Sequence, residues 1–281
     1  MSWLDRKQGR YRIRQLIGVE LPRGTGRLVM TENHFDNWIA NLEKRHFAEL
    51  RFPEVSRALK ALSATYVERR TKLAEGAALT GAGKRAAFAL FYGPLHFLTV
   101  REVVAQLSSA DRASGTIVDL GCGTGAGGAA WADACGSRPS VLGIDRNSWA
   151  LEEAARTYRQ FGVNARTRRG DVTRVDAPKP PVSWLAAFTL NELADDDREA
   201  LLTRLLDRAA KGDQVLVIEP IARGVAPWWD GWKDRVTAAG GRSDEWRFRI
   251  PLPPVVSKLD RAAGMDHREL TARSSWIGRQ A

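Results

Sequence analysis

The chain has 281 residues, of which 44% are hydrophobic, so it can form one large α/β domain or a domain with an extension. Its formal net charge of +10 favours an anionic partner such as nucleic acid, although a generally arginine-rich surface gives the same number. The two cysteines, Cys122 and Cys135, form no Cys-x-x-Cys pair, which argues against a disulfide scaffold and against a zinc or iron–sulfur site.

Residues 1–110 are predicted to form an N-terminal extension followed by a helical cap. Residues 1–15 are basic but lack the apolar core of a secretory signal, and no apolar run is long enough to span a membrane, so we expect a cytoplasmic protein. A strand-like run at residues 11–16 and a turn at residues 21–26 precede a helix near residues 34–48. The sequence assigns no function to this part.

Residues 53–110 have the apolar spacing of helices. One helix begins at Pro53, and a second apolar run over residues 86–107 is interrupted by Gly93-Pro94, where we expect a break. Helices joined by such turns, directly before a glycine-rich strand, indicate a cap over a site. Basic residues cluster between the two runs, where they form either a solvated helix end or an RNA contact: Arg69, Arg70, Lys72, Lys84 and Arg85.

Residues 111–281 are predicted to form an α/β domain, because strands and helices alternate regularly. Strands are expected at residues 116–120, 141–144, 164–168, 182–188 and 214–219, with helices at 126–134, 148–161 and 198–210. Repeated units of this kind form a doubly wound parallel sheet that binds ligands at the carboxyl ends of its strands. A helix at 255–263, between strands at 246–250 and 268–275, is expected to complete the domain with a hairpin-like pair.

The glycine-rich loop after the first strand identifies the class of ligand. Residues 123–128 match G-x-G-x-x-G, which taken alone predicts a dinucleotide with its pyrophosphate at the following helix. However, Asp119 precedes the first glycine of the loop, Gly121, by two residues. A carboxylate there is a poor neighbour for a pyrophosphate and a good one for a cation. S-adenosylmethionine carries an ammonium and a sulfonium and no phosphate, so the acid favours this cofactor.

The spacing Asp119-x-Gly121-x-Gly123-x-Gly125 resembles the first motif of class I S-adenosylmethionine-dependent methyltransferases, and four further motifs follow in order. The resemblance implies a Rossmann-like fold with a mostly parallel seven-stranded sheet. It implies that Asp145 binds both ribose hydroxyls and that Asp171 accepts a hydrogen bond from the adenine amino group. The residues expected to bind the cofactor are Asp119, Gly121, Cys122, Gly123, Gly125, Asp145, Arg146, Asp171, Val172, Phe188 and Thr189.

A narrower resemblance comes from three segments: residues 52–70, 190–193 and 218–220. Together they are similar to the ribosomal small-subunit methyltransferase-like family. This implies RNA, and in particular small-subunit ribosomal RNA, as the partner. Mitochondrial-type members act as assembly factors and carry iron–sulfur cysteines after the fifth strand, whereas residues 247–254 contain none. A bacterial-type member without a metal is therefore expected, and the assembly role is in doubt.

The catalytic candidates are Asn191 and Glu192, at the exit of the fourth strand. Methyl transfer needs positioning, plus a base when the nucleophile carries a proton. Asn191 is suited to orient a target amine or hydroxyl and Glu192 to take the proton, unless both merely cap the helix that begins near Asp195. Glu219 is a second candidate base. Cytosine C5 methylation is not expected, because neither cysteine is placed to attack the ring.

Tryptophans after the fifth strand are compatible with more than one class of substrate. Trp228, Trp229 and Trp232, with Trp246 and Phe248 further on, can stack on bases, line a small-molecule pocket, or pack a lid. The sequence thus predicts an RNA methyltransferase that binds through a basic surface. The alternatives are a small-molecule O- or N-methyltransferase acting on an aromatic or natural-product substrate, and a non-catalytic ribosome-assembly factor. The scattered histidines form no metal site, and His96 is interpreted as a core or cap residue.

Overall fold

The computed structural model describes residues 26–68, 79–107, 113, 115–176, 178–221 and 226–278. The strand-like run expected at residues 11–16 and the basic residues Arg69, Arg70 and Lys72 lie outside these ranges. No helix within the described ranges is long and apolar enough to cross a membrane.

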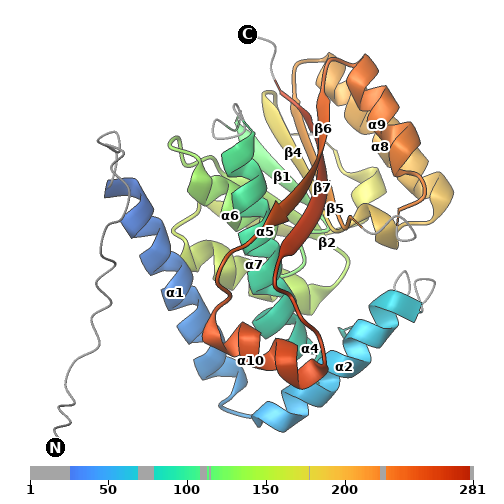
Figure 1. Cartoon of the computed structure of the whole chain (residues 1–281). Coiled ribbons are helices and arrows are strands. Elements are labelled where there is room, and N and C mark those ends of the chain that lie inside the picture. The colour runs from blue at the N-terminus through green and yellow to red at the C-terminus, as the bar shows by residue number, and fades with distance from the viewer. Residues whose placement is uncertain are drawn as a thin grey trace, which may run out of the picture.

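A seven-stranded sheet forms the centre of the molecule, in the order β3-β2-β1-β4-β5-β7-β6 (Figure 1). The first five strands in this order are parallel to one another, and β7 is antiparallel to both of its neighbours. Their bounds are β1 (Thr116–Leu120), β2 (Val141–Asp145), β3 (Ala165–Arg169), β4 (Val182–Ala187), β5 (Gln214–Glu219), β6 (Arg242–Phe248) and β7 (Leu270–Ile277). This confirms the predicted Rossmann-like methyltransferase fold. The strand order reverses between β1 and β4, where such sheets bind their ligands.

Two hydrophobic cores lie on opposite faces of the sheet, because successive strand residues point to opposite sides. Ile117 packs with residues of α5 (Gly93–Gln106), α6 (Ala126–Ala134) and α7 (Ser148–Gln160). Val118 packs with residues of α8 (Asp195–Ala210) and α9 (Trp229–Ala238). The central strands β1, β4 and β5 are buried over nearly their whole length, as expected for parallel strands covered by helices on both faces.

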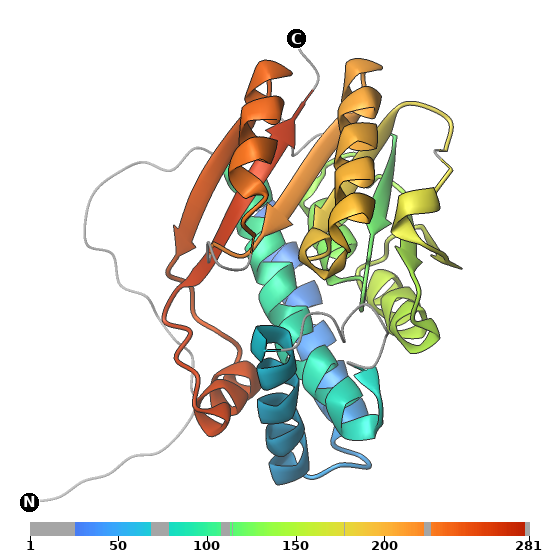
Figure 2. The same ribbon diagram turned by 90° about the vertical axis from the view of Figure 1, so that its right-hand side faces the viewer.

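Three more helices build the part of the molecule beyond the carboxyl ends of the parallel strands: α2 (Phe52–Glu68), α4 (Ala82–Ala87) and α10 (Pro254–Ala263). A further helix, α1 (Gly26–His46), runs alongside the sheet domain (Figure 1). α2 packs against α4 and α10, and α1 packs against α7. Figures 1 and 2 show α2 and α10 together at one end of the sheet. This helical end combines the predicted N-terminal cap with α10, and its core is continuous with that of the sheet.

The break expected at Gly93-Pro94 is wrong. α4 continues into a π-helix, η2 (Phe88–Tyr92), and then directly into α5. The N–H of Gly93 bonds to the carbonyl of Phe88, five residues earlier, and Pro94 follows at the start of α5, where a proline costs least. The wide π-helical turn therefore accommodates Pro94 without interrupting the helix. A π-helix of this kind is frequent at functional sites.

Candidate active site

Glycines shape the loop between β1 and α6. Gly121, Gly123 and Gly125 have φ of 66°, 51° and 78°, a region that favours glycine. A Cβ on Gly121 would lie 2.4 Å from Thr189 Cγ2, and one on Gly125 would lie 2.8 Å from Ala154 Cα. At Gly123 the nearest atom would be Phe88 Cε1, at 3.5 Å. The loop is thus packed tightly at both ends and has more room at its middle glycine.

Asp119 lies beneath this loop and is 1% exposed. Its Oδ2 accepts hydrogen bonds from the N–H of Gly128 (2.9 Å) and the hydroxyl of Tyr158 (3.2 Å). Burial raises the pKa of Asp119 to about 7. The sequence predicts this carboxylate beside the cofactor's cation. The structure instead turns it into the core, where it fixes the first turn of α6.

Cys122 also has its side chain in the core, 6% exposed as a residue. A Cβ on Gly143 would lie 3.0 Å from its Sγ, so the thiol fills the space beside β2. Burial raises the pKa of this thiol well above its usual value. The backbone N–H of Cys122 donates to the carbonyl of Ile144, at 2.9 Å. Only the backbone of this predicted cofactor-binding residue therefore borders the loop.

Asp145, at the end of β2, connects three parts of the predicted cofactor site. Its Oδ2 accepts from the N–H of Gly123 (2.9 Å), and its Oδ1 accepts from the N–H of Asn147 (2.8 Å), the residue that caps α7. Burial raises the pKa of Asp145. Each carboxylate oxygen can accept a further bond, so the side chain retains capacity for two hydroxyl donors.

Asp171 and Arg146 lie side by side beyond β3 and β2. Arg146 donates to Asp171 Oδ2 at 3.1 Å, and the N–H and hydroxyl of Thr173 donate to Asp171 Oδ1 at 2.9 and 2.8 Å. Partial burial opposes ionisation of Asp171, but these bonds outweigh it and lower its pKa. Val172 is buried at the start of the 3₁₀-helix η3 (Val172–Arg174). The structure thus brings four predicted residues, Asp145, Arg146, Asp171 and Val172, to the carboxyl ends of the neighbouring strands β2 and β3.

Phe188, directly after β4, has a φ of 58°, which is unusual for an aromatic residue. Its N–H bonds to the carbonyl of Ile218 (2.8 Å), and the hydroxyl of Thr189 donates to the carbonyl of Leu120 (2.9 Å). Surrounding bonds therefore hold this backbone in a costly conformation, a feature that clusters at functional sites.

His96, on α5, stacks on Phe188 with ring centroids 4.2 Å apart and an angle of 14° between the rings. Burial lowers the pKa of His96 to about 4, so its ring is neutral at physiological pH. Phe88 and Tyr92 lie within 6.2 and 6.0 Å of the same ring. The sequence does not predict this contact. The only signal was a histidine one turn after two aromatic residues on an apolar helix.

Asn191 is engaged within the protein at both ends of its amide. Its Nδ2 donates to Glu219 Oε2, and its Oδ1 accepts from Trp228 Nε1 at 3.2 Å. Glu219 is fully buried, also accepts from the N–H of Leu190 (2.7 Å), and has a pKa raised by burial to about 8. The predicted role of Asn191, orienting a target group, does not match this arrangement. Asn191 instead links β5 to Trp228.

Glu192 differs from Asn191, because its carboxylate has no hydrogen-bond partner among the residues that the structure describes. The pKa of Glu192 is raised to about 7, mainly by burial and also by the negative charge of Asp145. The positive charge of Arg146 lowers it in part. The carboxylate thus lies within electrostatic reach of the predicted ribose-binding residue. A partly buried acid poised near neutrality beside such a site is suited to accept a proton.

The tryptophans after β5 separate into two groups. Trp229 and Trp232 are 4% and 2% exposed, so they pack the core of α9, a helix that the sequence analysis did not predict. Trp228 is half-buried, with the guanidinium of Arg198 5.3 Å from its ring centroid. Trp246 stacks on Phe248 on the edge strand β6. Of the five aromatic residues proposed for substrate contact, only Trp228 bonds to a site residue.

These residues fit S-adenosylmethionine better than a dinucleotide. A pyrophosphate would need the N–H of Gly123, which already donates to Asp145. The predicted contacts to the ribose and adenine, Asp145 and Asp171, both lie at this edge of the sheet. Within the described ranges, no group of three His, Cys, Asp or Glu residues could hold a metal ion.

Comparisons with known proteins agree with this geometry. Residues 117–212 match a family model described as a methyltransferase domain. A search of curated proteins found no match to the sequence.

Several solved structures resemble this chain. Mitomycin 7-O-methyltransferase superposes with a TM-score of 0.50 at 16% identity, over 86% of this chain and 72% of that one. A candidate O-methyltransferase from Nostoc punctiforme PCC 73102 superposes with a TM-score of 0.51 at 14% identity, over 78% of this chain and 72% of that one. A candidate RNA methyltransferase from Pyrococcus horikoshii superposes with a TM-score of 0.42 at 14% identity, over 66% of this chain and 84% of that one. Residues 117–212 are thus a methyltransferase domain, and the chain has the fold of S-adenosylmethionine-dependent methyltransferases.

Proposed function

We propose that this methyltransferase acts on RNA, and specifically on small-subunit ribosomal RNA. The observation that carries the proposal is the row of arginines on the edge strand β3. Arg166, Arg168 and Arg169 are exposed there, and Arg169 donates to the backbone carbonyl of Arg146, beside Asp171. This row therefore adjoins the predicted adenosine end of the cofactor site.

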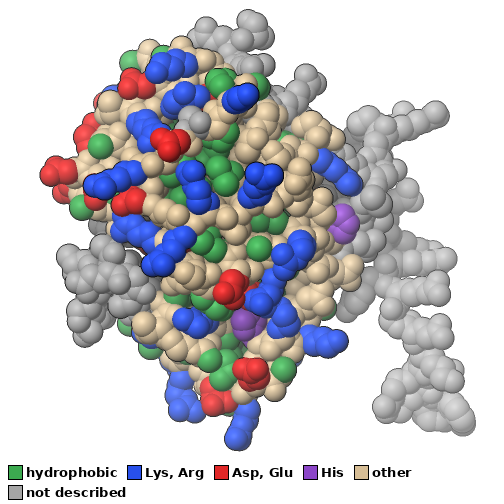
Figure 3. Space-filling model, turned by 180° about the vertical axis from the view of Figure 1, so that it is seen from behind, with side chains coloured by type: hydrophobic (Ala, Val, Ile, Leu, Met, Phe, Trp, Pro, Cys, Tyr) green, Lys and Arg blue, Asp and Glu red, His purple; other side chains and the backbone are tan. Residues whose placement is uncertain are grey.

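Charge balance makes this row a candidate for phosphate binding. Within the described residues, Arg166 and Arg168 have no ion-pair partner, so their charges are available to an external anion. Figure 3 shows Lys and Arg side chains spread over much of the face opposite that of Figure 1, with fewer acidic side chains among them. A small neutral substrate would need no such surface, whereas a polyanion would.

The narrower assignment to small-subunit ribosomal RNA rests on the sequence resemblance of residues 52–70, 190–193 and 218–220. The described part of the first segment forms α2, which packs against α4 and α10. The second and third segments contain Glu192 and Glu219. The three segments therefore belong to the helical end and to the strand exits that border the site.

The proposed chemistry rests on Glu192 and on the aromatic residues at the same strand exit. When bound, S-adenosylmethionine supplies an electrophilic methyl group on a sulfonium. Glu192 accepts the proton of the attacking N–H or O–H group, and its pKa of about 7 lets it do so near neutral pH. Phe188, held in its strained conformation and stacked on His96, presents a flat ring at the strand exit that can orient the acceptor.

A second function has one specific observation in its favour. Phe88, Tyr92, His96 and Phe188 form an aromatic group at this exit, and such a group could enclose a small aromatic substrate. An O- or N-methyltransferase for an aromatic metabolite therefore remains the alternative.

One experiment separates the two functions. The protein is incubated with S-adenosylmethionine labelled in its methyl group, and with either total RNA or a metabolite extract from the same cells. We expect label in RNA, concentrated in the small-subunit ribosomal fraction, and none with the Glu192→Gln variant. Label confined to the metabolite extract would replace the RNA proposal by the alternative.

A further inference from the structure

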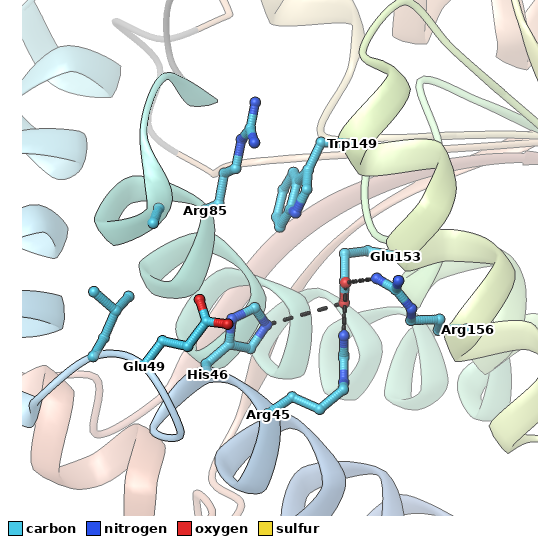
Figure 4. A pocket seen from close by; sticks show the side chains of 9 residues that line it. Arg45, His46, Glu49, Arg85, Trp149, Glu153 and Arg156 are labelled. Carbon is cyan, nitrogen blue, oxygen red and sulfur yellow. Dashed lines mark hydrogen bonds and ion pairs between the residues drawn. The ribbon is translucent and has the colours of Figure 1, made fainter.

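A pocket of about 280 Å³ lies outside the predicted cofactor site, between the end of α1, α4 and the first turns of α7 (Figure 4). Side chains from these three elements meet in it although they are far apart in the sequence. Arg45 and His46 come from α1, Arg85 from α4, and Trp149 from α7. Its size is close to that of small-ligand pockets.

A carboxylate held between two guanidiniums forms one side of the pocket. The Glu153 side chain is 2% exposed, and Arg45 donates to both of its oxygens at 2.7 and 2.6 Å. Arg156 donates to Glu153 Oε1 at 2.6 Å. Burial opposes the charge of Glu153, but the two arginines outweigh it and lower its pKa. The two guanidiniums of Arg45 and Arg156 thus face the single carboxylate of Glu153, and this hydrogen-bonded group carries one excess positive charge.

Arg85 and Trp149 lie at another side of the pocket (Figure 4). The guanidinium carbon of Arg85 is 5.7 Å from the centroid of the Trp149 ring. Arg85 Nε donates to the carbonyl of Leu79, and no carboxylate in the described ranges lies within ion-pair distance of Arg85. The pocket therefore offers an aromatic face together with a cation that has no charged partner.

His46 adds a polar atom without a partner. Its Nε2 is buried and has no hydrogen bond to any described residue, although it lies 4.0 Å from Glu153 Oε2. Burial lowers the pKa of His46, so the ring is neutral and can donate or accept a hydrogen bond. An unpaired buried nitrogen is costly, and a polar ligand would remove that cost.

The pocket adjoins the cofactor site on two sides. Trp149 lies one turn after Asp145, at the beginning of α7, whose cap residue Asn147 bonds to Asp145. Arg85 lies one turn before Phe88, which faces Gly123. A chain-like ligand that leaves the active site can therefore reach the pocket along either α7 or α4.

On the basis of the proposed function, we infer that this pocket binds a nucleotide of single-stranded RNA that neighbours the methylated one. Its base stacks on Trp149 next to Arg85, as bases do on exposed aromatic rings in RNA-binding proteins. Its phosphate lies on the side of Arg156, because Glu49, on the opposite side in Figure 4, would repel it. A hydrophobic ligand would instead strip water from several charged groups without pairing them.

The test measures binding of a labelled single-stranded RNA of about 12 nucleotides to the full chain by fluorescence anisotropy, with saturating S-adenosylhomocysteine. We expect Trp149→Ala to weaken RNA binding by about five- to 150-fold, the loss of one stacked base. Trp246→Ala is the matched control, because this half-buried tryptophan lies on the edge strand β6, and it should bind RNA like the wild type. Arg156→Gln should weaken RNA binding and reduce the slope of log affinity against log salt concentration by about one, because Arg156 contacts the phosphate.

Calorimetry with S-adenosylhomocysteine is run on each variant and should give wild-type affinity. If Trp149→Ala and Trp246→Ala bind RNA equally well, the nucleotide pocket is disproved while the RNA function stands. If Trp149→Ala loses affinity for S-adenosylhomocysteine to the same degree as for RNA, the pocket is part of the cofactor site and the inference is overturned. If the wild type binds no RNA, the pocket proposal and the proposed function both fall.

Discussion

The carboxylate of Asp145 accepts a hydrogen bond from the backbone N–H of Gly123, at 2.9 Å, across the gap between the ends of β2 and β1. The same carboxylate accepts from the N–H of Asn147, which caps α7. One side chain thus holds the glycine loop and the start of a helix in fixed positions. It also occupies a loop N–H that a phosphate would need, and so it favours a ligand with hydroxyl groups and positive charge.

Asp145→Ala should weaken binding of S-adenosylmethionine at least about tenfold, because two charge-assisted hydrogen bonds to the ribose would be lost and the loop would lose its anchor. Isothermal titration calorimetry with the cofactor measures the effect directly. Asp234→Ala, an exposed carboxylate on α9, is the control and should bind like the wild type. Unchanged affinity of Asp145→Ala would remove Asp145 from the cofactor site.

Gly125→Ala should unfold far more easily than Gly162→Ala, although both residues have a positive φ, 78° and 64°. At Gly125 the new Cβ would lie 2.8 Å from Ala154 Cα, which is backbone and cannot move cheaply, whereas at Gly162 nothing lies within 4 Å. We expect about 1 kcal/mol of destabilisation for Gly162→Ala and at least about 2 kcal/mol more for Gly125→Ala. Urea titration gives both values. Equal losses would show that the loop relaxes around a side chain.

The parts of the fold that local pattern determines were predictable from the sequence. The strands from β1 to β5 are short apolar or alternating runs bounded by polar and glycine residues, and the glycine loop carries its geometry in its own residues. The acids at Asp145 and Asp171 follow directly from the ends of β2 and β3. These features depend on neighbours in sequence, so one sequence sufficed to place them.

The features that the sequence did not reveal depend on contacts between distant segments. Asp119 was expected to face the ligand, but the hydroxyl of Tyr158, on α7, draws it into the core. Asn191 was expected to face the substrate, but Glu219 and Trp228 take up both ends of its amide. A residue's type and spacing cannot show which way its side chain turns when its partners lie on other elements.

Stability should fall as the pH rises from about 5 to about 8, because buried Glu219 and Asp119 have pKa values raised to about 8 and about 7. An acid whose pKa is raised by folding binds more protons in the folded state. Its stabilising contribution is complete below the pKa of the unfolded chain and is lost as the pH rises through the folded value. Urea unfolding at several pH values measures the slope.

Glu219→Gln removes one proton that the folded state binds. It should therefore reduce the slope of the unfolding free energy against pH by roughly 1.4 kcal/mol per pH unit, in the range where Glu219 titrates. The exposed Glu245 on β6 provides the control, since Glu245→Gln should leave the slope as it is in the wild type. A wild-type slope of the opposite sign would contradict the buried-acid account. So would a slope that Glu219→Gln does not alter.

Glu192→Gln should lower kcat by about 10²- to 10⁴-fold while leaving cofactor affinity nearly unchanged, because glutamine keeps the shape of the side chain but cannot accept the proton. In the wild type, activity should rise about tenfold per pH unit up to a pH of about 7 and then level off, since only the ionised form of Glu192 acts as the base. The variant should lack this acidic limb. Glu152→Gln, an exposed position on α7, is the control for kcat. A variant that keeps both the rate and the acidic limb would assign the base to another group, and Glu219 would be tested next by the same pH profile.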